Sequence, residues 1–414
     1  MRILYFTQFY HPENIAPAFR ASDHARIWAE AGHDVTVFTG WPNYPTGVLF
    51  KGYKMVKLGK ETIDGVRVFR SASKILPNTS FARRVEAGIS FIVGGLRNLR
   101  RSSPVGSDYD VVLVTCGTVF SAWLGVYYAK KHGLPLVVEF RDLTYKQMVA
   151  TGSSESSAKV RVMKALELSF CKAADCVVVL TEGFKRDLVA EGVDPSIISI
   201  VPNGADPVPC EHSWGERLRL GYFGTMGLSQ DVPTTLEYAK YLHDEECAES
   251  YTLIGEGAAR NDVEQAMEET GNSFLKLLHG MPMAELEKYY AAVDVTVVSL
   301  QKSESFAGTI PSKIFQSFAR GVPVLFIGPE GDASEVIRES GGGIALCGSP
   351  EEDLTLLLSF ARCGDLPLRL AEMSTSALDF MIKNYTRKHM ADQMITCLVE
   401  AENRQRMKGC RQNG

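Results

Sequence analysis

Short runs of consecutive apolar residues alternate along the chain with longer stretches in which apolar residues recur every three or four positions. The first such runs are RILYFT (2–7), DVTVFT (34–39), DVVLVT (110–115), LPLVVEF (134–140) and DCVVVLT (175–181). Between them, residues 17–31 and 158–173 have the period of a helix. Buried strands that alternate with helices are typical of a parallel sheet covered by helices. The first part of the chain is therefore predicted to be a doubly wound, Rossmann-like α/β domain.

A second series of the same kind follows a proline-rich linker at 200–215. Its strands are expected at 218–224, 250–255, 274–280, 294–300, 322–328 and 342–348, and its helices near 230–243, 258–270, 283–292, 312–320 and 332–340. The length of 414 residues also exceeds the roughly 250–300 at which a single core stops growing. We expect two such domains facing a cleft, at 1–204 and 205–384. A C-terminal helix and tail, 385–414, should cross back to the first domain.

Composition excludes some classes of function. The net charge of −5 argues against a nucleic-acid partner. The nine cysteines are odd in number and lack zinc-ligand spacing, which favours reduced thiols in a cytoplasmic protein. No signal-peptide pattern opens the chain, and no apolar run reaches the roughly 18–20 residues that span a bilayer. The Asp108-x-Asp110 pair imitates a metal motif but precedes a strand, so we expect a strand entry and no metal site.

One segment has the composition of a membrane-surface helix. FARRVEAGISFIVGGLRNLRR (81–101) joins an apolar stretch to Arg83, Arg84, Arg97, Arg100 and Arg101. A helix of this kind can lie in an anionic membrane surface. It can equally pack within its domain and leave the arginines in water.

Three strand ends of the second domain lead into turns suited to an anion. They are GYFGTMG (221–227), GEGAARND (255–262) and GTIPSKIF (308–315). Ser312 is expected to cap the third helix, with Lys313 in its first turn, where the helix dipole favours anions. Backbone N–H groups at helix N-termini bind phosphates, and Arg260 and Lys313 add positive charge. Together the three turns predict a diphosphate site.

In this order and spacing, these segments resemble the retaining glycosyltransferases of the two-domain GT-B fold, and among them glycosyltransferase family four. The resemblance covers nearly the whole chain and includes TEGFKRDLVAEGVDPSIISIVPNGAD (181–206), LIGEGAARNDVE (253–264) and HGMPMAELEKYYAAVDVTVVSL (279–300). The N-terminal stretch 10–47 is similar to the branch that adds sugars to lipid-linked intermediates of bacterial surface polysaccharides, such as O-antigen and capsule.

The resemblance implies a nucleotide sugar, UDP-linked by preference, held by the second domain, and a lipid-linked saccharide acceptor held mostly by the first. It implies no metal or other cofactor, because cations stabilise the charge on the leaving diphosphate. Carried over by position, Arg260 and Lys313 would grip the diphosphate. Three loop residues would approach the donor phosphate, and the backbone around Met281 would meet the base; the loop residues are Gly224, Thr225 and Gly227. For a lipid-linked acceptor, residues 81–101 would place the protein on the cytoplasmic face of the inner membrane.

The chain departs from the family pattern at the donor site. Gln316 stands where most of the family has a glutamate for the ribose hydroxyls, and FAGT (306–309) contains none of the earlier acid. Glu304 is the nearest carboxylate. A glutamine still hydrogen-bonds a hydroxyl, but a neutral bond is roughly half as strong as a charged one. We therefore expect an altered donor site.

In the first domain, Arg141 and Asp142 follow a strand end. They either orient the acceptor or leaving group, with Asp142 as the catalytic candidate, or form a salt-bridged loop pair. Two further classes of function stay open. One is a non-catalytic paralogue that acts as a nucleotide-binding scaffold, and the other is a UDP-aminosugar epimerase, which shares this architecture. The sequence predicts neither the sugar nor the oligomeric state.

Overall fold

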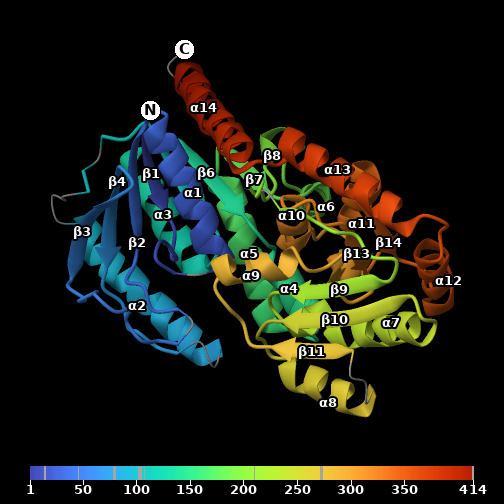
Figure 1. The fold of residues 1–414 in the computed structure, drawn as a ribbon. Helices are drawn as coiled ribbons and strands as arrows, with labels where there is room; N and C mark the ends of the chain where they lie inside the picture. The colour runs from blue at the N-terminus through green and yellow to red at the C-terminus, as the bar shows by residue number, and fades with distance from the viewer. Residues whose placement is uncertain are drawn as a thin grey trace. The chain divides into compact units, whose positions relative to one another are not determined.

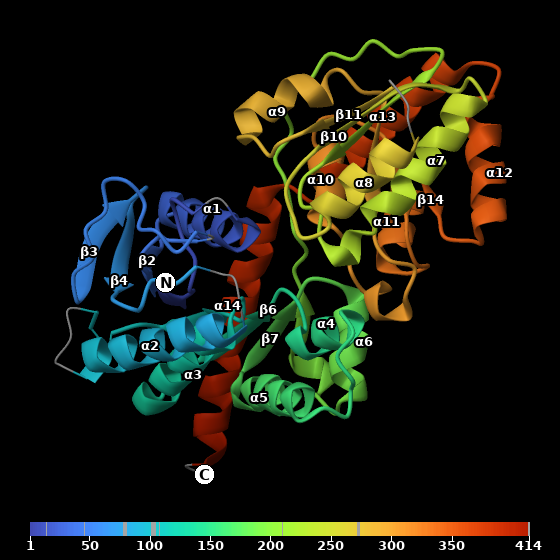
Figure 2. The same cartoon turned by 90° about the horizontal axis from the view of Figure 1, so that it is seen from below.

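The computed structural model describes residues 1–13, 15–44, 46–77, 81–100, 105–106, 108–208, 210–270 and 274–412. The chain divides into two compact units. Unit 1 comprises Met1–Tyr145, Ser154–Pro202 and Arg387–Gly414, and unit 2 comprises Lys146–Ser153 and Asn203–Thr386. Each is a largely parallel sheet with helices packed against it, which confirms the predicted α/β class (Figures 1 and 2).

The sheet of unit 1 has the strand order β3-β4-β2-β1-β5-β6-β7-β8. All neighbours are parallel except β3, which pairs antiparallel with β4. The strands are β1 (Arg2–Phe6), β2 (Asp34–Gly40), β3 (Leu58–Ile63), β4 (Val66–Ser71), β5 (Val111–Thr115), β6 (Leu136–Phe140), β7 (Cys176–Val179) and β8 (Ile198–Ile200). The central strands are buried along most of their length, as expected for a parallel sheet covered on both faces.

The helices of unit 1 come from both ends of the chain. They are α1 (Ala16–Glu30), α2 (Phe81–Arg100), α3 (Val119–His132), α5 (Ala158–Ala173), α6 (Glu182–Ala190) and α14 (Arg387–Gln412). Helix α4 (Thr144–Ala150) begins in unit 1, and its residues from Lys146 onward belong to unit 2. The predicted return of the C-terminal helix is confirmed, because the Trp28 indole N–H donates to the Ala391 carbonyl at 2.9 Å.

The sheet of unit 2 is entirely parallel, in the order β11-β10-β9-β12-β13-β14. Its strands are β9 (Leu218–Phe223), β10 (Ala248–Ile254), β11 (Leu275–Leu278), β12 (Val295–Ser299), β13 (Val324–Ile327) and β14 (Gly343–Leu346). Its helices are α7 (Val232–Asp244), α8 (Arg260–Thr270), α9 (Met283–Tyr290), α10 (Ser312–Phe318), α11 (Asp332–Ser340), α12 (Pro350–Ala361) and α13 (Leu366–Asn384).

Several local predictions can be compared with the structure. The prediction that Ser312 caps its helix is wrong: Pro311 holds the N-cap position, and Ser312 is the first residue of α10. The strand entry at Asp110 is confirmed, since its carboxylate accepts from the Arg2 backbone N–H at 2.7 Å. The cysteines whose side chains are described are free thiols.

The structure tests the membrane and metal predictions for the described residues. Residues 81–100 form α2, and Arg101 lies outside the described residues. Within the described ranges, no helix is both long enough and apolar enough to cross a bilayer. The same ranges contain no group of three or more His, Cys, Asp or Glu side chains that could hold a metal ion.

Candidate functional site

Lys313 lies at the second position of α10, beside the loop that follows β9. Its ammonium donates to the Thr225 carbonyl at 3.1 Å and lies 3.7 Å from the centroid of the Tyr222 ring. The face of an aromatic ring attracts a cation, but removal from water disfavours its charge. Burial lowers the pKa of Lys313 to about 7. A bound anion would give this ammonium a negatively charged partner and so favour its charged form.

Gly224, the residue after β9, allows the close approach of Lys313. It has a φ of 126°, and a Cβ atom there would lie 2.8 Å from the Lys313 Cε. Three residues on, the N–H of Gly227 donates to the Gln230 side-chain oxygen at 3.0 Å. The loop from Gly224 to Gly227 is thus shaped around the lysine, with Thr225 in direct contact with it.

The second glycine loop packs directly on the first. A Cβ atom at Gly255 would lie 1.8 Å from the Gly224 carbonyl oxygen, and one at Gly257 would lie 2.1 Å from that of Met226. The N–H of Met226 also donates to the Glu256 carbonyl at 2.8 Å. Because β9 and β10 are neighbours, the two loops form one surface at the carboxyl ends of the strands. Ligands of open α/β sheets bind at this edge.

Arg260 begins α8 at the same edge, as predicted, but its guanidinium is engaged by the protein. It donates to the carbonyls of Gly255 at 2.5 Å and Leu278 at 3.1 Å, and to the Glu264 carboxylate at 3.0 Å. These bonds tie the end of β10 to the end of β11. Arg260 therefore orders the loops, and the structure brings Lys313 into direct contact with the first of them.

Gln316 takes part in a network that the sequence analysis missed. Its side-chain oxygen accepts from Arg320 at 3.0 Å. Arg320 is buried, donates to Glu287 at 2.7 Å, and lies 4.5 Å from the centroid of the Tyr290 ring. The spacing of four residues between Gln316, on α10, and Arg320, two residues past the end of α10, was the available signal.

The turn that contains Met281 is held against the glycine loops. Met281 is half-buried against a small cluster that includes Phe223 and Ile254. The carboxylate of Glu256 bonds the His279 ring at 2.8 Å and the Gly280 N–H at 3.2 Å. The His279 hydrogen bond lowers the pKa of Glu256. The backbone predicted to meet the base therefore lies next to the predicted phosphate loop.

An acidic residue that the sequence analysis did not consider packs against the acid-free stretch 306–309 through its backbone. Asp332, the first residue of α11, is buried, and its N–H donates to the Ala307 carbonyl at 2.8 Å. Glu304 is exposed at the start of a short 3₁₀ turn. The acid closest in sequence thus points to water, and an acid from a later helix packs beside the stretch.

In unit 1, Asp142 is exposed at the end of β6, next to a buried group of charges. Glu139 accepts from Arg20 at 2.8 Å and from Thr115 at 2.5 Å. Burial alone would raise the pKa of Glu139, but Arg20 and Arg141 lower it to about 2. Burial lowers the pKa of the neighbouring His24 to about 3, so this imidazole stays neutral at pH 7.

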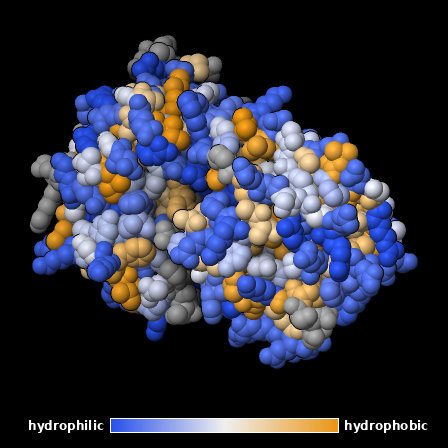
Figure 3. Space-filling model, viewed as in Figure 1, coloured by the Kyte–Doolittle hydropathy of each residue, from blue (hydrophilic) through white to orange (hydrophobic). Residues whose placement is uncertain are grey.

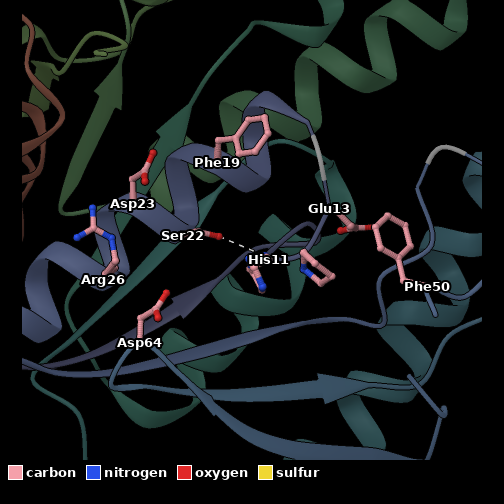
Figure 4. Close-up of a pocket in the computed structure, with 9 residues that line it drawn as sticks. His11, Glu13, Phe19, Ser22, Asp23, Arg26, Phe50 and Asp64 are labelled. Atoms are coloured by element: carbon pink, nitrogen blue, oxygen red, sulfur yellow. Dashed lines mark hydrogen bonds between the residues drawn. The ribbon is translucent and has the colours of Figure 1, made fainter. Parts of the chain in front are cut away.

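A polar cavity of about 490 Å³ lies beside α1 in the same unit (Figure 4). Phe19, which is 51% exposed, and Phe50 present aromatic rings to it among charged side chains. These charged side chains are Glu13, Asp23, Arg26 and Asp64. The carboxylate of Glu13 fixes one wall by accepting from the N–H groups of Asn43 and Tyr44 at 3.0 Å.

Residues 17–204 match the family model described as a glycosyl transferase 4-like domain. The probable glycosyltransferase WbjE of Pseudomonas aeruginosa is 26% identical over 225 residues, which are 51% of this chain and 56% of WbjE. The putative colanic acid biosynthesis glycosyl transferase WcaI of Escherichia coli strain K12 is 21% identical, over 95% of this chain and 99% of WcaI.

The same similarity is seen in three dimensions. The structure of HepE of Anabaena in complex with UDP superposes with a TM-score of 0.65 at 13% identity, over 96% of this chain and 100% of that one. The fold is that of the GT-B glycosyltransferases. In sequence, residues 17–204 match the glycosyl transferase 4-like model, in agreement with the resemblance to glycosyltransferase family four.

Proposed function

We propose that this chain transfers a sugar from a nucleotide donor, UDP-linked, to a saccharide carried by a lipid, in the assembly of a bacterial surface polysaccharide. The family match and the names of the relatives support the reaction class. The solved complex of HepE with UDP supports the donor class. The transferred sugar is expected to be an N-acetylated aminosugar or a deoxysugar.

The observation that carries the proposal is the contact of Lys313 with the loop at Gly224 and Thr225. In the proposed complex the diphosphate lies on the two glycine loops. Lys313 and backbone N–H groups stabilise its charge as the bond to the sugar breaks. Arg260 orders the loops and adds a second positive charge. Gln316 contacts the ribose, and the turn at Met281 contacts the base.

The transfer proposed here retains the anomeric configuration and uses no metal. The bond from the sugar to UDP breaks, the bond to the acceptor oxygen forms, and the acceptor proton passes to the leaving diphosphate. Unit 1 would hold the acceptor, with Asp142 orienting its hydroxyl and the polar cavity beside α1 contacting its saccharide. The protein would work at the cytoplasmic face of the membrane, with α2 on the lipid surface.

The test is a transfer assay with UDP-sugars and synthetic alkyl-diphosphate-linked saccharides. We expect transfer with a retained configuration by NMR, an unchanged rate in EDTA, and a loss of 100-fold or more in Lys313→Ala. Binding of UDP without transfer to any acceptor would favour a scaffold. Interconversion of UDP-aminosugars without an acceptor would favour an epimerase.

A further inference from the structure

An open apolar groove runs along α2 in unit 1. Its volume is about 1320 Å³, above the roughly 300–1,000 Å³ typical of sites for small ligands. One stripe of α2, with the three- and four-residue spacing of a helix face, forms one side, and two chain segments form the other. We call it the α2 groove; its lining includes Ala82, Val85, Ile89, Val93 and Arg97 of α2, with Met55, Lys57, Ala72, Lys74 and Ile75.

The α2 groove leaves large apolar side chains in contact with water. Ile89 is 52% exposed, Met55 41% and Val93 39%. Apolar side chains reach the molecular surface over α2 in Figure 3. Contiguous exposed apolar surface in a groove marks a site of interaction, because covering it with an apolar group is favourable.

The walls of the groove are held in place without a ligand. A Cβ atom at Gly94 would lie 2.2 Å from the Ala72 carbonyl, so α2 and this segment are in backbone contact. The Lys74 N–H donates to Ser90 at 2.7 Å, and the Asn98 amide donates to the Lys57 carbonyl at 2.8 Å. These bonds fasten both flanking segments to α2, so the site is preformed.

The charges of the lining select for an anion. Lys57, Lys74 and Arg97 face one acid, Glu86, which is 2.5 Å from the Lys74 ammonium. An apolar trough with a net positive lining matches a hydrocarbon chain that ends in a phosphate. We propose that the α2 groove binds the hydrocarbon chain and phosphate of a single anionic lipid. This rests on the proposed function, and identifies the part of unit 1 that holds the lipid of the acceptor.

The test uses the full-length protein and farnesyl phosphate below its micellar concentration. We expect saturable binding that is at least tenfold weaker for farnesol and absent for inorganic phosphate. Ile89→Glu should weaken binding tenfold or more, because it places a negative charge in the trough. Val162→Glu is the matched control: Val162 is 67% exposed on α5 and lies outside the groove.

The stabilisation of each variant by UDP is measured in parallel. An unchanged UDP shift in Ile89→Glu shows that the fold and unit 2 are intact, and a missing shift in the wild type counts against the proposed function alone. Equal binding of farnesyl phosphate to wild type and Ile89→Glu would overturn the proposal. So would adsorption to phosphatidylserine vesicles without binding of the monomeric lipid, or a dimer that Ile89→Glu dissociates.

Discussion

At the scale of single residues, the charge of Lys313 is the central feature of the proposed donor site. Its ammonium is partly desolvated, with the Tyr222 ring on one side and the Thr225 carbonyl as a hydrogen-bond acceptor. Burial lowers its pKa to about 7, whereas a bound diphosphate would raise it, because an opposite charge nearby favours the charged form. We therefore expect binding of the proposed donor and protonation of Lys313 to be coupled.

The first prediction follows from this coupling. Below pH 7 Lys313 is already charged, so affinity for a UDP-sugar should be constant. Above pH 7 binding must take up a proton, so Kd should rise, by up to tenfold per pH unit, between pH 7 and 9. Calorimetry in buffers of different ionisation enthalpy measures the uptake. Lys313→Arg should bind without this pH dependence, because arginine stays protonated; an unchanged pH dependence in that variant would assign it to another group.

Gly224 provides a second test of the same contact. Gly224→Ala should weaken UDP binding tenfold or more, since the added methyl group would displace the Lys313 side chain. Gly32→Ala is the control, because Gly32 also has a positive φ, 87°, but has no heavy atom within 4 Å of the added Cβ. Full UDP affinity in Gly224→Ala would show that the lysine need not lie against the loop.

Gln316 leads to a prediction in the opposite direction. Gln316→Glu should tighten UDP binding about fivefold, because a charged hydrogen bond to a ribose hydroxyl is roughly 1 kcal/mol stronger than a neutral one. Arg320, which already bonds the Gln316 oxygen, would compensate the added charge. Affinity for a 2′,3′-dideoxy analogue of UDP should not change. Equal tightening for both nucleotides would mean that position 316 does not contact the ribose.

At the scale of secondary-structure elements, α14 carries much of the packing of unit 1. Met390, Met394, Leu398 and Ala401 are fully buried along one side of it. Each buried Met or Leu side chain contributes about 1.5–3 kcal/mol. The stability of unit 1 therefore depends on the last helix of the chain.

Two neighbouring residues of α14 test this dependence. Leu398→Ala should destabilise the protein by about 2–5 kcal/mol and lower its Tm by several degrees, because it leaves a cavity in the core. Val399→Ala, at a position 39% exposed, should change stability by less than about 0.5 kcal/mol. Thermal unfolding followed by circular dichroism compares them. Equal Tm values for Leu398→Ala and Val399→Ala would contradict the burial of Leu398 in the core of unit 1.

Some of the helices and strands were predictable from the sequence, and others were missed. Most of the parallel strands were predicted because buried strands are continuous apolar runs, although the observed strands are shorter at their ends and β4 and β8 were not predicted. Helix α3 was missed because it is apolar on nearly every side and so lacks a helical period. The β3–β4 hairpin and α12 were overlooked despite clear signals, the Asp64–Gly65 turn and the Ser349–Glu352 capping box.

At the scale of the whole molecule, the proposed donor site is built from segments that lie far apart in the sequence. The loops at Gly224 and Gly255 were predictable as neighbours, because both follow strands of one parallel sheet. The approach of Asp332 to Ala307 was not, because it depends on where α11 begins after β13. The hydrogen bonds by which Arg260 joins the ends of β10 and β11 could not be predicted either. Their acceptors are backbone carbonyls, which every residue has.

The central claim, that unit 2 binds a nucleoside diphosphate through Lys313, is tested most directly by thermal unfolding. The wild type and Lys313→Ala are each unfolded with UDP, with UDP-N-acetylglucosamine and with GDP. Ligand at about a hundred times its Kd adds about 2.7 kcal/mol to the folded state, which is several degrees for units of this size. We predict a shift with the uridine nucleotides that is lost in Lys313→Ala. Equal shifts in both proteins, or no shift with any nucleotide, would contradict the claim.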